Sequence, residues 1–296
     1  MKKRLIYTLL FSLLFIIINA RTLNNVDYSI AYINDYEGDC ELKRKGKDIG
    51  EAILDIYVPL YEGDSVITGY DSRIEIVFDD ATIIKLDPNS RLVIRNLKRD
   101  KGYKTIIELI KGRLMGVVKK LIEKEEFAVK TKLAMAAVKG TELIVETGEE
   151  DSVGVYEGQV EVASYDKDGN IKKKIILDKD KETRIVKYLG PDRPRKLSKN
   201  FIKKYKEIKD IREKIKYIRE LREKGKTKEY KLKKRLDRIN KLRMMKNDPT
   251  IYKNMSPEQK KLIDEMIKLE PYYQSQLDEE KKKERKTKII INKYKK

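Results

Sequence analysis

Short runs of alternating apolar and polar residues dominate the chain up to about residue 190. Ten such runs follow one another, at 73–78, 82–86, 91–95, 104–110, 126–131, 141–146, 152–156, 159–164, 173–177 and 183–187. Apolar residues at every second position are typical of strands with one buried face. The connections between the runs are rich in Gly, Asp, Asn and Pro and are too short for helical crossovers. The pattern therefore predicts mostly antiparallel sheets, arranged as a β sandwich or as a short coiled β-sheet stack.

The spacing of apolar residues changes to three or four positions after Pro191 and Pro194, which is typical of amphipathic helices. Ser198 is placed to cap the first predicted helix, and Gly225 to interrupt it. The stripe of that helix consists of Phe201, Tyr205, Ile208, Ile211, Ile215, Ile218 and Leu221. A second stripe consists of Leu232, Leu236, Ile239 and Leu242. The fold class that we predict is therefore mainly β followed by α.

The segment 256–271 predicts a third helix. Ser256 and Gln259 have the spacing of a capping box, Pro257 takes the first helical position, and Pro271 is expected to end the helix. The residues after it finish in a basic run, 281–296, for which the pattern predicts no definite structure.

The first residues have the pattern of a secretory signal. Three basic residues precede an apolar run, 5–18, and Ala20 is the expected cleavage position. The run is shorter than the roughly 20 residues that span a bilayer. No cysteine follows it directly, so a lipid anchor is not indicated. We therefore expect the protein to be exported, to the periplasm or elsewhere in the cell envelope.

The net charge of +20 comes from the last third of the chain. Residues 191–296 contain 37 Lys and Arg against 17 Asp and Glu, whereas residues 1–190 contain 32 of each. Charge and periodicity change together, so we expect a signal peptide (1–20), a β domain (30–190) and a basic, charged helical extension (196–296). Acids and bases alternate along the first helix, which predicts a solvated face supported by pairs four residues apart.

The composition excludes several kinds of catalytic site. The chain has no His and one Cys, which rules out His-based acid–base catalysis, Cys–His pairs and disulfides within the chain. Cys40 is expected to fill an apolar strand position, with a reactive or intermolecular thiol as the alternative. No phosphate-binding loop or dinucleotide motif is present, and we expect no enzyme activity and no cofactor.

Three segments of the chain are rich in acidic residues. Adjacent carboxylates at 79–80 and 149–151 are expected in solvated turns, although carboxylate pairs also serve glycoside cleavage. The stretch "DKDGN" at 166–170 has the start of a calcium loop without its later acidic ligand, so we predict a hairpin turn and no metal site.

Four stretches together resemble the FecR domain family, over about residues 36–165. They are "GDSVITGYDSRIEIVFDDATIIKLDPNSRLVI" from 63, "IIELIKGRL" from 106, "FAVKTKLAMAAVKGTELIV" from 127 and "VGVYEGQVEVAS" from 153. The resemblance implies a non-catalytic β module of the bacterial envelope. Regulators of that family pass a signal from an outer-membrane receptor to a cytoplasmic sigma factor. Its structural positions are expected at Gly63, Asp64, Gly112, Gly140, Thr141 and Gly158.

The step from Gly140 to Thr141 is expected to build the fold rather than bind a ligand. Gly140 permits a positive φ or the close approach of another backbone, and Ala134, Ala136 and Ala137 leave room for it. Thr141 closes the turn with its hydroxyl and continues as a β-branched strand residue.

These features predict an exported binding or scaffold module whose basic helical tail contacts an anionic polymer, a lipid surface or an envelope protein. Peripheral membrane contact and self-association through the helices remain open. Nucleic acid is not an expected partner, because the protein is exported. The alternatives are an envelope signalling regulator acting through protein contact, and a carbohydrate-active enzyme. Because the export signal begins at Met1, we expect a freestanding module rather than a transmembrane regulator.

Overall fold

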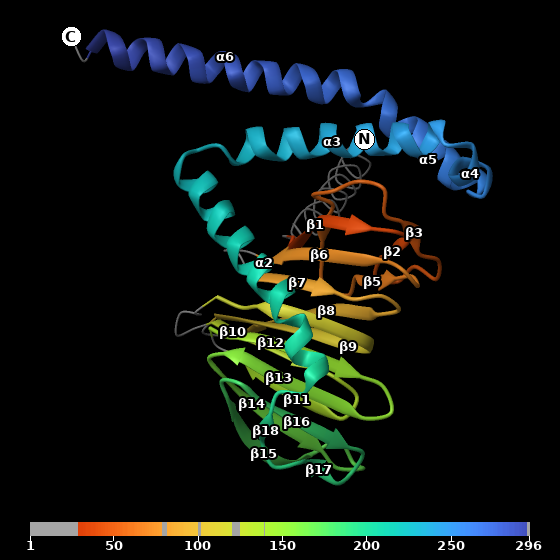
Figure 1. The fold of residues 1–296 in the computed structure, drawn as a ribbon, viewed down its shortest axis with the longest axis vertical. Coiled ribbons are helices and arrows are strands. Elements are labelled where there is room, and N and C mark those ends of the chain that lie inside the picture. The colour runs from red at the N-terminus through yellow and green to blue at the C-terminus, as the bar shows by residue number, and fades with distance from the viewer. Residues whose placement is uncertain (1–28, 79–81, 100–101, 120–124, 139, 295–296) are drawn as a thin grey trace, which may run out of the picture.

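The computed structural model describes residues 29–78, 82–99, 102–119, 125–138 and 140–294. Strands occupy the described chain up to Lys196, and helices follow from Lys199 (Figure 1). The predicted fold class, mainly β followed by α, is confirmed. The expected signal peptide and its cleavage position Ala20 lie outside the described residues.

The strands form two sheets that face each other. Sheet A has the spatial order β4 (Pro59–Leu60), β1 (Ala31–Glu37), β6 (Arg73–Phe78), β7 (Thr82–Leu86), β9 (Gly102–Val117), β12 (Glu142–Thr147), β13 (Asp151–Glu157) and β16 (Lys181–Val186), with β17 (Gly190–Pro191) and β18 (Arg195–Lys196) beside β16. Sheet B has the order β3 (Glu51–Ala52), β2 (Cys40–Lys43), β5 (Ser65–Thr68), β8 (Arg91–Arg99), β9, β10 (Glu125–Lys130), β11 (Ala134–Val138), β14 (Gln159–Tyr165) and β15 (Ile171–Asp178). Among the described strands, only β9 and β10 pair in parallel.

Strand β9 belongs to both sheets and joins them. Its residues up to Lys111 pair with β8 in sheet B, and those from Gly112 onward pair with β12 in sheet A. Gly112 has a φ of +90° at this junction, and a Cβ there would lie 2.7 Å from the Cα of Ser90. The bend therefore requires glycine on two grounds, its backbone conformation and its lack of a side chain.

The core lies between the two sheets. It is formed by the inward-facing Ile, Leu and Val side chains of both layers, among them Ile33, Ile76, Leu92, Ile107, Leu143 and Val160. Cys40 is 2% exposed in the same core, so its thiol fills a strand position, and burial raises its pKa to about 12. Such a thiol is a poor nucleophile.

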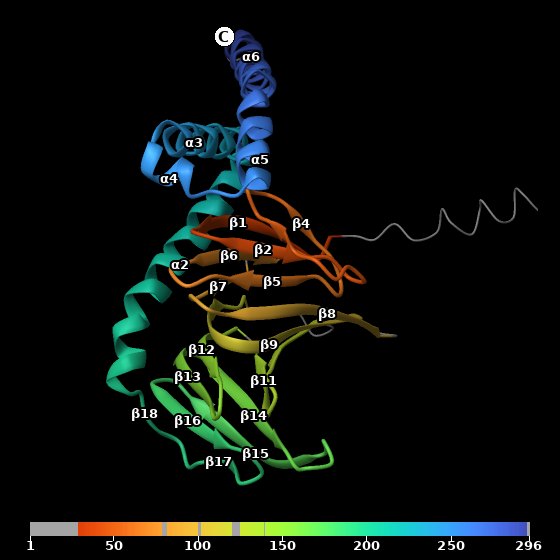
Figure 2. The same ribbon diagram turned by 90° about the vertical axis from the view of Figure 1, so that its right-hand side faces the viewer.

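Helix α2 (Lys199–Glu223) crosses the outer face of sheet A (Figures 1 and 2). The hydroxyl of Ser198 accepts a hydrogen bond from the amide of Phe201, as the predicted N-cap. The buried side of the helix carries Phe201, Ile208, Ile211, Ile215 and Ile218, which pack on Val77, Ile83, Met115, Ile144 and Tyr156 of the sheet. Both faces of sheet A are thus covered.

The remaining helices form an arm at one end of the strands (Figure 1). The helical arm consists of α3 (Thr227–Asn247), α4 (Pro249–Lys253), α5 (Pro257–Lys268) and α6 (Glu270–Tyr294). Helices α3 and α6 are held together by Leu232, Ile239, Tyr273 and Leu277. Gly225, with a φ of +64°, makes the turn between α2 and α3. No described helix is both long enough and apolar enough to cross a membrane.

The helical part differs from the prediction only beyond the third helix. The capping box of Ser256 and Gln259 is present, and α5 begins at Pro257 and ends at Lys268, ahead of Pro271, as predicted. Pro271 is itself part of a further helix, α6. It lies in the first turn of α6, where the backbone N–H that proline lacks has no partner in any helix. The basic terminal run continues this helix as far as Tyr294.

Eight described strands lie outside the ten predicted runs: the five before Gly69, β11, and the two-residue strands β17 and β18. In β1 a bulge between Ile33 and Asp35 interrupts the period, and the polar side chain of Asn34 is buried. Strand β11 consists mostly of small residues, "AMAAV", which give little contrast between its faces.

Candidate functional site

Gly63 and Asp64 form a turn ahead of β5. Gly63 has a φ of +88°, and Asp64 is 2% exposed. The Asp64 carboxylate accepts hydrogen bonds from Arg44, at 2.6 Å, and from the amide of Tyr61, at 2.9 Å. The turn is therefore closed by its own residues and by Arg44.

Gly140, Thr141 and Gly158 lie together. The Thr141 hydroxyl donates to the carbonyl of Gln159 at 2.9 Å, and Thr141 also exchanges backbone hydrogen bonds with Val118. Gly140 and Gly158 have φ values of +66° and +86°, and a Cβ on Gly158 would lie 2.8 Å from the carbonyl oxygen of Gly140. These hydrogen bonds and close approaches hold the turns of the fold together. The other expected positions have different neighbours: a Cβ on Gly63 would meet Lys45, the Asp64 carboxylate binds Arg44, and a Cβ on Gly112 would meet Ser90. Lys139, between Val138 and Gly140, lies outside the described residues.

The acidic segments differ in their surroundings where the structure describes them. Asp79 and Asp80 lie outside the described residues, and Glu149 and Glu150 are exposed. The expectation of a solvated turn is wrong for Asp151, which is fully buried at the start of β13. In the described parts of the chain, no group of three or more acids or cysteines is placed to hold a metal ion.

Asp151 is the centre of a buried hydrogen-bond network. Its carboxylate accepts hydrogen bonds from the hydroxyls of Thr131 and Thr147 and from the amide of Leu133. Burial raises the pKa of Asp151, and these hydrogen bonds offset part of the rise. The network ties the β10–β11 turn to the start of β13, which is a structural role.

The stretch "DKDGN" is the β14–β15 hairpin turn that its sequence predicts. A side-chain oxygen of Asp166 accepts hydrogen bonds from the amides of Asp168 and Asn170, each at 2.9 Å. Gly169 has a φ of +84° in this turn. The carboxylate therefore stabilises the turn by binding backbone amides, as in an Asx turn.

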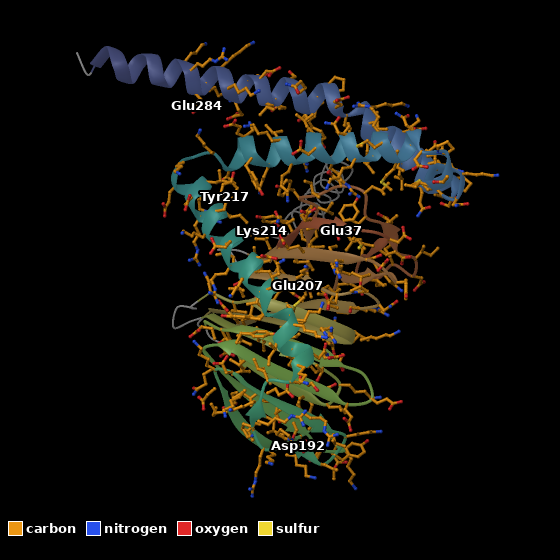
Figure 3. The ribbon with its side chains drawn as sticks, in the orientation of Figure 1. Glu37, Asp192, Glu207, Lys214, Tyr217 and Glu284 are labelled. Carbon is orange, nitrogen blue, oxygen red and sulfur yellow. The ribbon has the colours of Figure 1, made fainter. Side chains whose placement is uncertain are left out.

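Four charges of α2 pair with charges of the sheet, which the prediction of a solvated face did not include, whereas others, such as Lys203 and Lys206, are exposed as predicted. Lys204 pairs with Asp87, Glu207 with Lys85, Arg212 with Glu142 and Lys214 with Glu75, at 2.6 to 2.9 Å. Figure 3 labels Glu207 and Lys214 where α2 crosses the strands. The hydrogen bonds from Lys85 and Lys204 hold the pKa of Glu207 below its usual range despite its burial. No local pattern could signal this pairing, because the two partners are more than a hundred residues apart in three of the four pairs.

Helix α3 lies on β1 and on the neighbouring loop through cations and tyrosine rings. The guanidinium of Arg238 is 3.8 Å from the ring centroid of Tyr36, and Lys231 is 4.5 Å from that of Tyr32 and 5.0 Å from that of Tyr57. Burial raises the pKa of both Tyr36 and Tyr57. Some of the positively charged side chains of the helical arm therefore bind tyrosine rings of the same molecule.

Ion pairs reinforce this contact. Lys234 pairs with Asp35 at 3.2 Å and Arg235 with Asp55 at 3.5 Å. Arg235 also donates to the carbonyl of Ile56, at 3.3 Å. The helical arm is therefore attached to the β strands by directed contacts.

The outer surface of the helical arm carries two kinds of exposed residue. Lys282, Arg285 and Lys286 are exposed near the end of α6. Four large apolar side chains are exposed where α3, α4, α5 and the start of α6 meet, and we call them the apolar tip: Met244 at 72%, Ile251 at 42%, Leu269 at 40% and Tyr272 at 59%. Such a group is typical of a protein contact surface.

Two pockets lie on the surface of the strands. One, of about 530 Å³, lies between Gly140–Thr141 and α2, and it mixes acids with bases, including Glu142, Arg212 and Lys216. The other, of about 510 Å³, is lined by the turns β10–β11, β14–β15 and β16–β17. No sequence signal pointed to the second pocket, because its residues come from three separate turns.

Comparisons with known proteins identify one domain. No curated protein matches the chain. Two crystal structures of a candidate anti-sigma factor from Parabacteroides distasonis ATCC 8503, at 1.65 and 2.50 Å resolution, each align with 16% identity and a TM-score of 0.39. Each alignment covers 48% of this chain and 63% of the other, which is less than two thirds of its length. Residues 64–161 match the family model described as FecR protein. The chain therefore contains a FecR domain, which runs from the start of β5 into β14.

Proposed function

We propose that this protein is a non-catalytic, regulator-type FecR-domain protein of the bacterial cell envelope that acts by binding another protein. The observation that carries the proposal is the apolar tip of the helical arm, formed by Met244, Ile251, Leu269 and Tyr272. Large exposed Met and Tyr side chains next to lysines suit a partner with an apolar patch and surrounding acids.

The fold supports a role for the arm in passing on a signal. The FecR strands pack against α2, and α2 leads through Gly225 directly into α3. Cation–π contacts and ion pairs then attach α3 to β1. A partner at the apolar tip is therefore connected to the FecR strands through packed elements.

Site-specific photo-crosslinking in bacterial cells tests the proposal. A photoreactive amino acid at Tyr272 is expected to give discrete protein adducts. The matched control replaces Tyr70, which is 82% exposed in the turn between β5 and β6. The triple variant M244S/L269S/Y272S is expected to lose binding of the identified partner in purified form while keeping the wild-type melting temperature.

Three results would contradict this function. They are adducts that form equally from both positions, an absence of adducts at Tyr272, and an enzymatic turnover by the pure protein that is abolished by changing one carboxylate.

A second candidate is an electrostatic tether to an anionic surface, which the exposed Lys282, Arg285 and Lys286 favour. Co-sedimentation with envelope membranes and cell-wall sacculi across a salt series distinguishes it. A tether predicts salt-sensitive binding that K282Q/R285Q/K286Q weakens. The matched control, K199Q/K203Q/K206Q, removes equal charge from exposed positions on α2. A truncation at Gly190 is unsuitable, because it would uncover the apolar face beneath α2.

A further inference from the structure

The pocket of the three turns is lined in part by the β14–β15 and β16–β17 turns, whose strands lie at the end of the molecule away from the helical arm (Figure 1). Its volume of about 510 Å³ is in the range of small-molecule sites, roughly 300–1,000 Å³. It belongs neither to the apolar tip nor to the Gly140–Thr141 region.

Each of the three turns contributes one exposed lysine to this pocket: Lys132, Lys167 and Lys187. Among the residues that the structure describes, none of the three is in an ion pair. The pocket also contains two acids. Glu108 pairs with Lys130 at 3.4 Å, and the Asp166 carboxylate accepts hydrogen bonds from backbone amides of its own turn. With Lys130, the lining therefore carries four lysines against these two acids, and its net positive charge favours binding of an anion.

Two tyrosines add flat, partly apolar surface. Tyr165 is half-buried, and burial, with Glu108 beside it, raises the pKa of its hydroxyl, which therefore stays a hydrogen-bond donor. The Tyr188 ring is 47% exposed, with the amino group of Lys187 at 4.9 Å from its centroid. Tyr188 has a φ of +63°, a conformation that costs a non-glycine residue about 1 kcal/mol or more.

Hydrogen bonds fix the backbone on two sides of the pocket. Thr131 and Leu133, on either side of Lys132, are buried and bound to the Asp151 carboxylate. On the other side, the amino group of Lys172 donates to the carbonyl of Tyr188. The backbone at Lys132 and at Tyr188 is therefore held in position before any ligand arrives.

We propose that this pocket binds an anionic sugar, a saccharide unit that carries a carboxylate or a phosphate. The lysines would bind the anionic group, and the tyrosine rings would cover an apolar face of the sugar ring while leaving its hydroxyls in water. This inference is independent of the proposed protein contact at the apolar tip.

Titration calorimetry of the full chain tests the inference. The probes are N-acetylmuramic acid for the carboxylate, glucose 1-phosphate for the phosphate, neutral N-acetylglucosamine, inorganic phosphate and an oligoglutamate peptide. One of the two anionic sugars is expected to bind at least roughly tenfold more tightly than each of the other three probes. Which sugar binds distinguishes a cell-wall source from a phosphorylated glycan.

Two variants locate the site. K132Q/K167Q/K187Q is expected to weaken sugar binding by roughly tenfold or more, whereas K199Q/K203Q/K206Q leaves it unchanged. Tyr188→Gly removes the ring at a left-handed position that glycine adopts without strain, so it is expected to weaken binding while leaving the melting temperature near that of the wild type. The proposal is overturned if neither anionic sugar binds, if phosphate or oligoglutamate binds as tightly, or if the pocket triple variant binds as the wild type does.

Discussion

Arg238 stacks on Tyr36, with its guanidinium carbon 3.8 Å from the ring centroid, and so joins α3 to β1. The contact is partly desolvated, since Tyr36 is 4% exposed. We expect Arg238→Ala to lower the free energy of unfolding by about 1–2 kcal/mol, through loss of the cation–π contact and of packing by the Arg side chain. Urea unfolding measures this change. Lys241→Ala, exposed on the same helix, is the control and is expected to stay within about 0.5 kcal/mol of wild type.

Gly154 makes room for the start of α2. A Cβ at this position would lie 2.6 Å from the Phe201 ring and 3.0 Å from the Ile144 side chain. We expect Gly154→Ala to destabilise the protein by about 1–3 kcal/mol, because the helix must move off the sheet. Adding Phe201→Leu should recover part of the loss. Gly148→Ala, where a Cβ meets nothing within 4 Å, is the control. A Gly154→Ala variant as stable as the control would show that α2 is not seated as described.

Gly158 and Gly169 allow backbone strain to be separated from close approach. Their φ values are +86° and +84°, but only Gly158 has neighbours, with the Gly140 carbonyl oxygen 2.8 Å from a built Cβ. Alanine at Gly169 should cost about 1 kcal/mol for the left-handed conformation alone. Alanine at Gly158 should cost at least about 1 kcal/mol more. Equal melting temperatures for the two variants would refute the close approach.

Asp151 makes stability depend on pH in a predictable direction. Burial raises its pKa in the folded state, so the folded protein holds the proton more tightly than the unfolded chain. Protonation therefore stabilises the fold: this contribution is complete below the unfolded pKa, about 4, and is lost as the pH rises through the folded pKa. Relative to Asp151→Asn, which cannot titrate, the wild type should gain stability between pH 7 and pH 4. Denaturant unfolding at these pH values measures the difference, and a difference that does not change with pH would contradict the raised pKa.

The fold class could be predicted because period-two and period-three-to-four spacing are local properties of the chain. For that reason the predicted apolar stripe, which includes Phe201 and Ile218, lies on the buried side of α2, and Ser198 caps the helix as predicted. The pairing of β9 with β12, and that of Glu75 with Lys214, could not be predicted, since these contacts join residues far apart in the sequence. Asp151 was missed because a carboxylate next to Glu149 and Glu150 has the pattern of a solvated turn.

The candidate sites, too, could be predicted where their residues are close in sequence and could not where they are far apart. The FecR resemblance pointed to Gly140, Thr141 and Gly158 because they are close in sequence as well as in space. The lysines of the anion pocket, Lys132 and Lys187 among them, are each unremarkable in their own turn. Only the three-dimensional arrangement of the turns brings them to one place.

The path of α2 across sheet A also limits the size of this fold. The amide of Ser198 is bonded to Glu182 on β16, and Lys214 pairs with Glu75 on β6. Between β16 and β6 lie five inter-strand steps, through β13, β12, β9 and β7, or about 24 Å at about 4.8 Å each.

The helix from Ser198 to Lys214 rises by the same length, about 24 Å at about 1.5 Å per residue. It therefore works as a ruler that matches the number of strands. A homologue that gains one β hairpin within this span would need about six more residues in the helix to keep both end contacts. Insertions in the strands and in α2 should consequently occur together in evolution.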